Sequence, residues 1–443
     1  MQKRHTRSIS AALLVFFFAT NAYPQQPARP ADSWMQVAKL TASSDQGGEL
    51  VGTSVAIDGD TAVVGYPYVY TGTGAGEALV FVKPTKGWTN LTQTAVLVPS
   101  DGNSGDYFGI AVAAQGDVIV VGSAQDQFNP GGPGAAYVFV KPAGGWKGQL
   151  TETAKLIASD GMKWDGLGTS VSISGNTIVA GAPGSVSSST PGAGYIFVRP
   201  TGGWKNATQT AKLIASDGRT FDELGFSVSI DGNTAITGAP YALGRSNQKE
   251  GAAYVFVEPS GGWKDSTQTA KLVASDGAMY DALGYSVSIA RDTVVAGALD
   301  ATVGSNPMQG AAYVFVEPSG GWKNMTQTAK LTEEDGEPGD LLGSSVATSG
   351  NVVAAGAAEY SRGPNLKQGT RAFWQEGALY LFTEPSGGWR TASSKTKLNG
   401  SDARYRAWLG SSLALKGNII ITGAPALSYL SPWQGAAYLF ELP

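Results

Sequence analysis

The stretch AKLIASDGMKWDGLGTSVSISGNTIVAGAPGSVSSSTPGAGYIFVRPTGGWKNATQT, residues 154–210, decides the fold because related copies fill most of the chain. Each copy opens with a short motif that ends in Leu, and the motif recurs every 57 to 67 residues, at Ala38, Ala95, Ala154, Ala211, Ala270, Ala329 and Thr396. Self-similarity at a nearly fixed period predicts units that bury their apolar faces against their neighbours. Seven units therefore indicate one array rather than seven domains.

One unit contains the signals of four β-strands. Residues 169–173 alternate polar and apolar side chains and meet a Ser-Gly-Asn turn, after which residues 177–180 form a second, apolar run. Residues 193–198 are rich in aromatic and branched side chains, and residues 210–215 alternate as a strand with one wet face does. Seven units of four antiparallel strands predict an all-β, seven-bladed β-propeller.

The two ends of the array are complementary. The last unit stops after its third strand, at residues 435–443, whereas residues 34–42 match only a fourth strand. A linear solenoid would need atypical capping repeats instead. We therefore expect the N-terminal strand to complete the last blade and close the ring, which leaves no unpaired edge at the seam.

The N-terminus has the pattern of a secretory signal. Basic residues precede an apolar run at residues 11–19, and Thr-Asn-Ala, ending at Ala22, forms a plausible cleavage site. The apolar run is too short to span a bilayer. We expect a signal peptide at 1–22, a Pro-rich linker at 23–33, a propeller at 34–443, and secretion to the extracellular or periplasmic space without a membrane span.

Composition excludes several functions. The formal net charge is −4, and loss of residues 1–22 makes it about −7, so no nucleic-acid partner is expected. There is no Cys, and the single histidine, His5, lies in the signal segment. The mature chain therefore lacks Ser-His-Asp and Cys-His catalysis and the usual zinc ligands, and no cofactor is expected. An enzyme would depend on other groups, such as the paired carboxylates of a glycoside hydrolase.

Two short signatures recur from unit to unit. Gly-Ala-Pro closes the second strand at residues 181–183, 238–240 and 423–425. An apolar residue and Gly open the first strand at Val51-Gly52, Phe108-Gly109, Leu167-Gly168, Leu224-Gly225, Leu283-Gly284, Leu342-Gly343 and Leu409-Gly410. From residue 34 to 443 the chain resembles FG-GAP repeat proteins, which include the seven-bladed propeller of integrin α-subunits and many secreted bacterial proteins. The resemblance implies the propeller fold; for function it is weak, because one fold hosts many activities.

Integrin-type repeats often carry a calcium loop between the first and second strands. Here that connection is only a turn, such as Asp58-Gly59-Asp60 or Ser174-Gly175-Asn176. Calcium takes about six to eight oxygen ligands, and a turn offers at most two carboxylates. No metal site is expected.

The connections between strands four and one and between strands two and three share one face of a propeller, and tight one-to-two and three-to-four turns are expected on the other. The four-to-one loops repeat two acids, and three of them place an aromatic residue before the second acid, at Trp164-Asp165, Phe221-Asp222 and Tyr280-Asp281. Aromatic and carboxylate side chains together suit a sugar. Alternatively, the acids cap turns and the aromatic residues fill space between blades. The sequence leaves both readings open.

Departures from the repeat are the better guide to function. The two-to-three loop of the sixth unit, residues 357–376, is the longest and contains Tyr360, Arg362, Lys367, Arg371, Phe373 and Trp374. The seventh unit adds Tyr405, Trp408, Tyr429 and Trp433. Arg, Trp and Tyr often anchor interfaces, although an insertion packed by its own aromatic side chains has the same composition.

Six tryptophans follow Gly near the outer turns and are expected to pack at the blade rim: Trp88, Trp146, Trp204, Trp263, Trp322 and Trp389. The leading hypothesis is a secreted, monomeric, non-enzymatic binding or adhesion module that engages an extracellular protein or glycan. The alternatives are a carboxylate-based glycoside hydrolase or lyase and a structural envelope protein.

Overall fold

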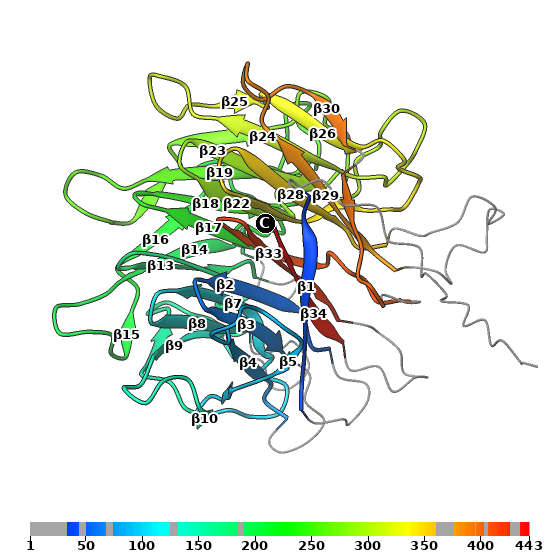
Figure 1. The fold of residues 1–443 in the computed structure, drawn as a ribbon. Helices are drawn as coiled ribbons and strands as arrows, with labels where there is room; N and C mark the ends of the chain where they lie inside the picture. Colours follow the sequence, from blue (N-terminus) through cyan, green and yellow to red (C-terminus); the bar gives the residue numbers. More distant parts are fainter. Residues whose placement is uncertain are drawn as a thin grey trace, which may run out of the picture.

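The computed structural model describes residues 33–43, 50–67, 74–124, 132–184, 190–359, 376–394, 396–402, 406–425 and 435–442. Their regular secondary structure is all β-strand, arranged as seven sheets around a central axis (Figure 1). The innermost strand of each sheet contacts the innermost strand of the next, and the last contacts the first. The predicted seven-bladed β-propeller is confirmed.

Each blade runs from the axis outward through four antiparallel strands. The first strands are β2 (Ser54–Asp58), β7 (Phe108–Gln115), β12 (Ser170–Ser174), β17 (Ser227–Asp231), β22 (Ser286–Ala290), β27 (Leu342–Thr348) and β32 (Ser412–Lys416). The second strands are β3 (Thr61–Tyr66), β8 (Val118–Ser123), β13 (Thr177–Ala182), β18 (Thr234–Ala239), β23 (Thr293–Ala298), β28 (Val352–Ala357) and β33 (Ile419–Ala424). These seven pairs define blades 1 to 7.

The outer strands continue each sheet. The third strands are β4 (Glu77–Val82), β9 (Ala135–Val140), β14 (Ala193–Val198), β19 (Ala252–Val257), β24 (Ala311–Val316), β29 (Ala378–Thr383) and β34 (Ala436–Glu441). The fourth strands are β6 (Ala95–Leu97), β11 (Ala154–Ile157), β16 (Ala211–Ile214), β21 (Ala270–Val273), β26 (Ala329–Glu333), β31 (Lys397–Leu398) and, in blade 7, β1 (Met35–Thr41).

Six of the seven sheets have a fifth strand, which the sequence analysis did not predict. These short strands are β5 (Leu91–Thr92), β10 (Gly148–Leu150), β15 (Ala207–Thr208), β20 (Ser266–Thr267), β25 (Met325–Thr326) and β30 (Ala392–Ser394). Each lies in the three-to-four connection of one blade and pairs in parallel with the fourth strand of the preceding blade, as Leu91 does with Leu40. The three-to-four connection is therefore not the tight turn that was expected. The equivalent segment for blade 6 would precede β1, outside the described residues.

The N-terminal strand closes the ring as predicted. In Figure 1, β1 lies beside β34, and the two pair antiparallel from Met35 opposite Glu441 to Leu40 opposite Ala437. Gln36 strengthens the seam, because its side-chain oxygen accepts a 2.8 Å hydrogen bond from the amide of Ser401 in blade 6. Blade 7 thus joins the two ends of the chain in one sheet.

The core is divided among the seven interfaces between adjacent blades. Each interface holds one cluster of buried side chains, such as the cluster that joins Leu156 of blade 2 to Ile178 of blade 3. Six clusters include one of the six predicted rim tryptophans, all buried with at most 8% of their surface exposed. These tryptophans were predicted to be packing residues at the blade rim, and the structure places each of them in a buried cluster between two blades.

The two recurring glycines lie where neighbouring blades touch. A Cβ atom on Gly181, at the end of β13, would lie 1.9 Å from the carbonyl oxygen of Gly225 in the next blade. Gly225 itself has a φ of +94°, and a Cβ there would lie 2.3 Å from the carbonyl oxygen of Ala193. No larger residue fits at such contacts without moving backbone. The glycines of the two recurring motifs are therefore required by the close packing of adjacent blades.

Candidate ligand-binding face

The four-to-one and two-to-three loops lie at the same end of the propeller, which we call the loop face. Leu167, at the end of one four-to-one loop, pairs in parallel with Gly134, at the end of the preceding blade's two-to-three loop. The same bridge recurs at each blade interface. The opposite end, which carries the one-to-two turns, is called the hairpin face.

The first acid of each four-to-one loop joins two blades. Asp101, which follows β6, accepts hydrogen bonds from Lys155 (2.5 Å) and Tyr137 (2.9 Å) of the next blade. Burial alone would raise the pKa of Asp101, but these two hydrogen bonds lower it below the usual value. The same Lys-Asp-Tyr arrangement recurs at Asp160, Asp217, Asp276, Asp335 and Asp402. These acids are scaffold.

The second acid of each loop caps its own turn. Asp165 accepts a 2.7 Å hydrogen bond from the amide of Met162, and Asp222 and Asp281 accept equivalent bonds of 2.8 Å. All three carboxylates are buried, and burial raises their pKa. This geometry corresponds to the turn-capping reading of these acids.

The aromatic residues beside these acids are more accessible. Tyr280 is 53% exposed and Phe221 is 39% exposed, whereas Trp164 is half-buried with the Lys163 ammonium 4.5 Å from its ring centroid. All three have left-handed backbones, with φ near +70°. Gly105 and Gly339 occupy the same position in two other blades, so the turn itself needs only glycine. Holding a bulky residue there costs about 1–2 kcal/mol, which argues for a role beyond the turn.

A cavity of about 410 Å³ on the loop face is lined by Met162 and Asp165, which belong to the same four-to-one loop as Trp164. Its lining includes Met162, Asp165, Tyr195 and Lys212, with Pro191 from the two-to-three loop of blade 3. Lys212 is already paired with Asp160, whereas Oδ1 of Asp165 is buried without a hydrogen-bond partner.

Most of the predicted site of blades 6 and 7 lies outside the described residues. This applies to Tyr360, Arg362, Lys367, Arg371, Phe373, Trp374, Tyr405 and Trp433. Trp408 is described: it is half-buried, with a φ of +53°, before the first strand of blade 7. The participation of these residues in a site therefore stays a prediction.

A second group of side chains, which the sequence analysis missed, lies on the loop face around the turns that precede the first strands of blades 4 and 5. We call it the mouth cluster: Glu223, Phe226, Tyr241, Tyr285 and Asp300. Phe226 and Tyr285 immediately precede the first strands of blades 4 and 5, and their ring centroids are 4.8 Å apart with a 45° tilt. Burial, followed by the charges of Glu223 and Asp300, raises the pKa of Tyr241. Burial, and then the charges of Tyr241, Asp300 and Glu223, raise the pKa of Tyr285. Phe226 joins these four side chains through its ring contact with Tyr285.

The mouth cluster was detectable in the sequence. The position after the apolar-Gly pair is aromatic in only two repeats; elsewhere it is Thr53, Ile110, Thr169, Ser344 or Ser411. The two exceptions are adjacent blades, and β-propeller geometry brings adjacent first strands together. The residue type at this one position of the repeat is therefore enough to identify the ring pair, though not the polar members of the cluster.

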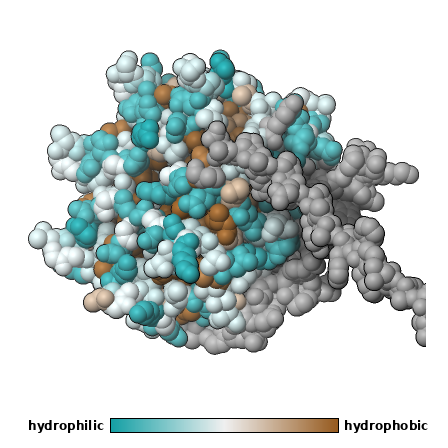
Figure 2. All heavy atoms as spheres, in the orientation of Figure 1, coloured by the Kyte–Doolittle hydropathy of each residue, from teal (hydrophilic) through white to brown (hydrophobic). Residues whose placement is uncertain are grey.

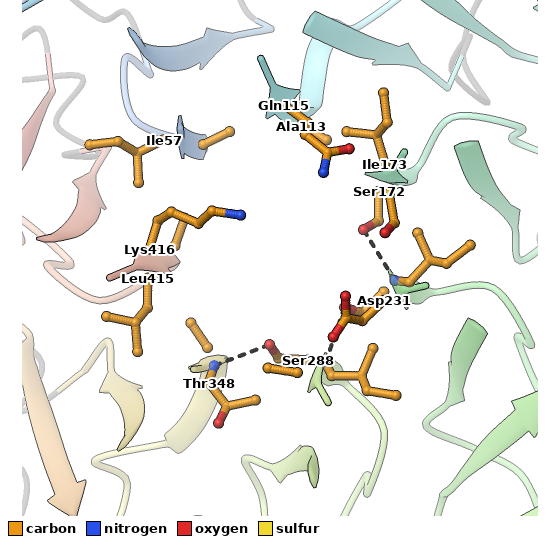
Figure 3. A pocket seen from close by; sticks show the side chains of 18 of the residues that line it. Ile57, Ala113, Gln115, Ser172, Ile173, Asp231, Ser288, Thr348, Leu415 and Lys416 are labelled. Atoms are coloured by element: carbon orange, nitrogen blue, oxygen red, sulfur yellow. Dashed lines mark hydrogen bonds between the residues drawn. The ribbon is translucent and has the colours of Figure 1, made fainter. Parts of the chain in front are cut away.

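The central channel is lined by the first strands of all seven blades. Figure 3 shows side chains of the first strands converging on an open centre, with Lys416 pointing inward, and the cavity measures about 520 Å³. Serine hydroxyls bridge neighbouring first strands, as when Ser172 accepts a 3.2 Å hydrogen bond from the amide of Ile230. On the hairpin face Lys416 lies 3.5 Å from Asp58. These contacts hold the ring together.

One buried acid departs from the repeat. Glu333, at the end of β26, stands where Ala42, Ala158, Ala215 and Ala274 stand in other units. It is 3% exposed, and neither carboxyl oxygen has a partner with hydrogen-bond geometry. Burial, and then the neighbouring Asp340, raise its pKa to about 9. Burial, and then the charge of Asp335, raise the pKa of Asp340 to about 8.

Within the described ranges, no three His, Cys, Asp or Glu side chains gather closely enough to hold a metal ion. The described part of the chain also contains no helix long and apolar enough to cross a membrane. Figure 2 shows hydrophilic side chains over most of the visible coloured surface, with apolar side chains in small separate patches.

Comparisons with known proteins agree with this architecture. The FG-GAP repeat family matches residues 34–81, 91–139, 150–197, 207–256, 266–315 and 325–382. Among solved structures, the crystal structure of the WD40 β-propeller domain of Doa1 is similar, with a TM-score of 0.50 and 10% identity over 92% of this chain and 97% of that chain. At this identity the likeness concerns the fold alone. No curated protein sequence matches the chain. The repeats, the blade-contact glycines and the closed ring together establish that the chain belongs to the FG-GAP repeat family.

Proposed function

We propose that this protein is a secreted, non-enzymatic binding or adhesion module that engages an extracellular protein or glycan through its loop face. FG-GAP propellers generally act as protein-binding or structural scaffolds. The signal-like N-terminus supports secretion, and the net charge of the mature chain argues against nucleic acid.

The observation that carries the proposal is the placement of Trp164, Phe221 and Tyr280. Three consecutive four-to-one loops present a partly exposed aromatic ring from a left-handed backbone position, where glycine serves two other blades. Aromatic residues supply much of the contact area in binding interfaces. A position that is conformationally costly and solvent-exposed contributes more to recognition than to stability.

This reading is tested by replacing the aromatic residue with glycine. Tyr280→Gly keeps the left-handed turn and relieves its strain, so the melting temperature should stay the same or rise while binding to glycan and extracellular-protein arrays falls. Lys86→Gly in the outer three-to-four connection of blade 1 is the control and should bind as the wild type does. Unchanged binding by Tyr280→Gly, Trp164→Gly and Phe221→Gly would contradict the proposal.

The predicted anchors of the sixth two-to-three loop are tested in the same assay. Trp374→Ala and Arg371→Ala should weaken binding without lowering the melting temperature. Unchanged affinity in both variants would remove this loop from the site.

The enzymatic alternative, a carboxylate-based glycoside hydrolase or lyase, draws on the raised pKa values of Glu333 and Asp340, because perturbed acids gather at catalytic sites. Both side chains are at most 3% exposed, which leaves a substrate no access to them in this conformation. A hydrolysis assay on every glycan retained by the array separates the two functions: retention without product supports a binding module, and product formation lost in Asp340→Asn establishes an enzyme.

A further inference from the structure

We infer that the mouth cluster is a saccharide-binding site, in which the Phe226–Tyr285 ring pair receives the apolar face of a sugar and Glu223, Tyr241 and Asp300 bind its hydroxyl groups. This inference rests on the proposed binding function of the loop face and names its ligand class and its position.

The ring pair provides the platform. Phe226 and Tyr285 come from two adjacent blades, are half-buried and have ring centroids 4.8 Å apart, each one residue before the first strand of its blade. The C–H groups on one face of a pyranose are apolar and pack against aromatic rings. Because five of the seven repeats have small or aliphatic residues here, packing of the scaffold does not require the rings.

The polar groups around the platform have unused hydrogen-bonding capacity. Among the described residues, the carboxylates of Glu223 and Asp300 and the hydroxyls of Tyr241 and Tyr285 form no hydrogen bond, and all four side chains are half-buried. Other acids of the loop face already have partners within the scaffold. Asp217, for example, pairs with Lys271 and accepts a hydrogen bond from Tyr254. Carboxylates accept from sugar hydroxyls, and phenols both donate and accept, so a molecule with several adjacent hydroxyl groups matches this set.

The charge of the site also favours a saccharide. The Lys249 ammonium lies 6.0 Å from the centroid of the Tyr241 ring, and its charge acts on Glu223. With two carboxylates and one ammonium, the site suits neither a polyanion nor a strongly cationic ligand. An acceptor beside a donor matches a pair of neighbouring sugar hydroxyls.

The test uses the mature chain, residues 23–443, on an array of neutral oligosaccharides, followed by calorimetric titration with the retained sugars. Tyr285→Ala removes half of the platform, and Asp300→Asn keeps side-chain volume but removes the charged acceptor. Ile110→Ala truncates the same position in blade 2 and is the matched control. We expect affinity to fall about tenfold or more in Tyr285→Ala and severalfold in Asp300→Asn, with Ile110→Ala unchanged.

Retention of no oligosaccharide, or equal affinity in the wild type, Tyr285→Ala and Asp300→Asn, would overturn the inference. Asp300→Asn should preserve packing. A melting temperature equal to that of the wild type would show that its loss of binding does not come from unfolding. Capture of an extracellular protein by the loop face, insensitive to Tyr285→Ala, would sustain the binding function while overturning the saccharide site.

Discussion

The hydroxyl of Ser412 donates a 2.8 Å hydrogen bond to the carbonyl oxygen of Gly52, so residues 360 positions apart in the sequence meet at the seam of the ring. Ser170 and Gly225 make the same 2.8 Å bond between two interior blades. The interface between blades 7 and 1 is therefore built like the others, although it joins the two ends of the chain.

The first prediction concerns this seam. Deletion of residues 34–42 removes β1 and leaves β34 without its outer neighbour, so the melting temperature should fall by roughly 10 °C or more. Deletion of residues 23–33 should leave it unchanged. Thermal unfolding followed by circular dichroism compares the two, and equal melting temperatures would refute closure by the N-terminal strand.

The second prediction separates contact from conformation at two glycines of one repeat. Gly181→Ala places a Cβ 1.9 Å from the backbone carbonyl of Gly225 and should cost about 3 kcal/mol or more in the free energy of unfolding. Gly175→Ala has open space around its Cβ and only a φ of +59° to sustain, so about 1 kcal/mol is expected. Denaturant titration measures the free energy of unfolding of both variants. Equal losses would show that the close contact between blades at Gly181 does not add to the cost of the substitution.

The sequence predicted the blades because the same strand and turn signals occur seven times, so each copy supports the others. It did not predict the fifth strands, since a two-residue strand such as Leu91–Thr92 pairs with a neighbouring blade and has no local signature. The mouth cluster escaped for a similar reason: Glu223, Tyr241 and Asp300 sit in three different loops and meet only in the ring. The sequence shows that Glu333 places a carboxylate where four other repeats have Ala. Only the structure shows that this carboxylate is buried without a hydrogen-bond partner.

The third prediction concerns Glu333. Its pKa in the folded protein, about 9, exceeds the ordinary value near 4.5, so the folded state binds an extra proton between these limits. Stability should therefore fall as pH rises from about 5 to 9. The groups that act on Glu333 are Asp340, Asp335, Lys397 and Tyr380.

Glu333→Ala restores the residue of four other repeats. It should raise the free energy of unfolding at pH 8 by about 1–3 kcal/mol and flatten this pH dependence, because a buried unpartnered polar group is removed. Glu258→Ala, at a half-buried site, serves as the control and should leave the slope intact. Urea titrations at pH 5, 7 and 9 provide the measurement, and an unchanged slope in Glu333→Ala would contradict the assignment.

The fourth prediction concerns the Lys-Asp-Tyr links between blades. Lys271 and Asp217 lie 2.6 Å apart and are only partly shielded from water, so a double-mutant cycle with Lys271→Met and Asp217→Asn should give a coupling of about 0.5–1 kcal/mol. The pKa of Asp217 is lowered by its hydrogen bond to Lys271 despite burial, so this contribution is present at neutral pH and lost as pH falls below about 4. A coupling energy of zero at pH 7 would show that this link does not stabilise the folded protein.

Blade 1 replaces this link by an apolar pair. Leu79 and Val96 lie opposite each other where the other blades pair Tyr with Lys.

The central claim, that the loop face is the binding surface, is tested most directly by blocking one face at a time. Because the chain has no Cys, single cysteines at Met279 on the loop face and Asp117 on the hairpin face can each be labelled with a maleimide polyethylene glycol. Met279 is 51% exposed, and the Asp117 side chain is 72% exposed. We predict that the label at position 279 abolishes binding to the glycan or protein retained on the arrays while the label at 117 does not. Binding lost only with the label at 117 would contradict the account.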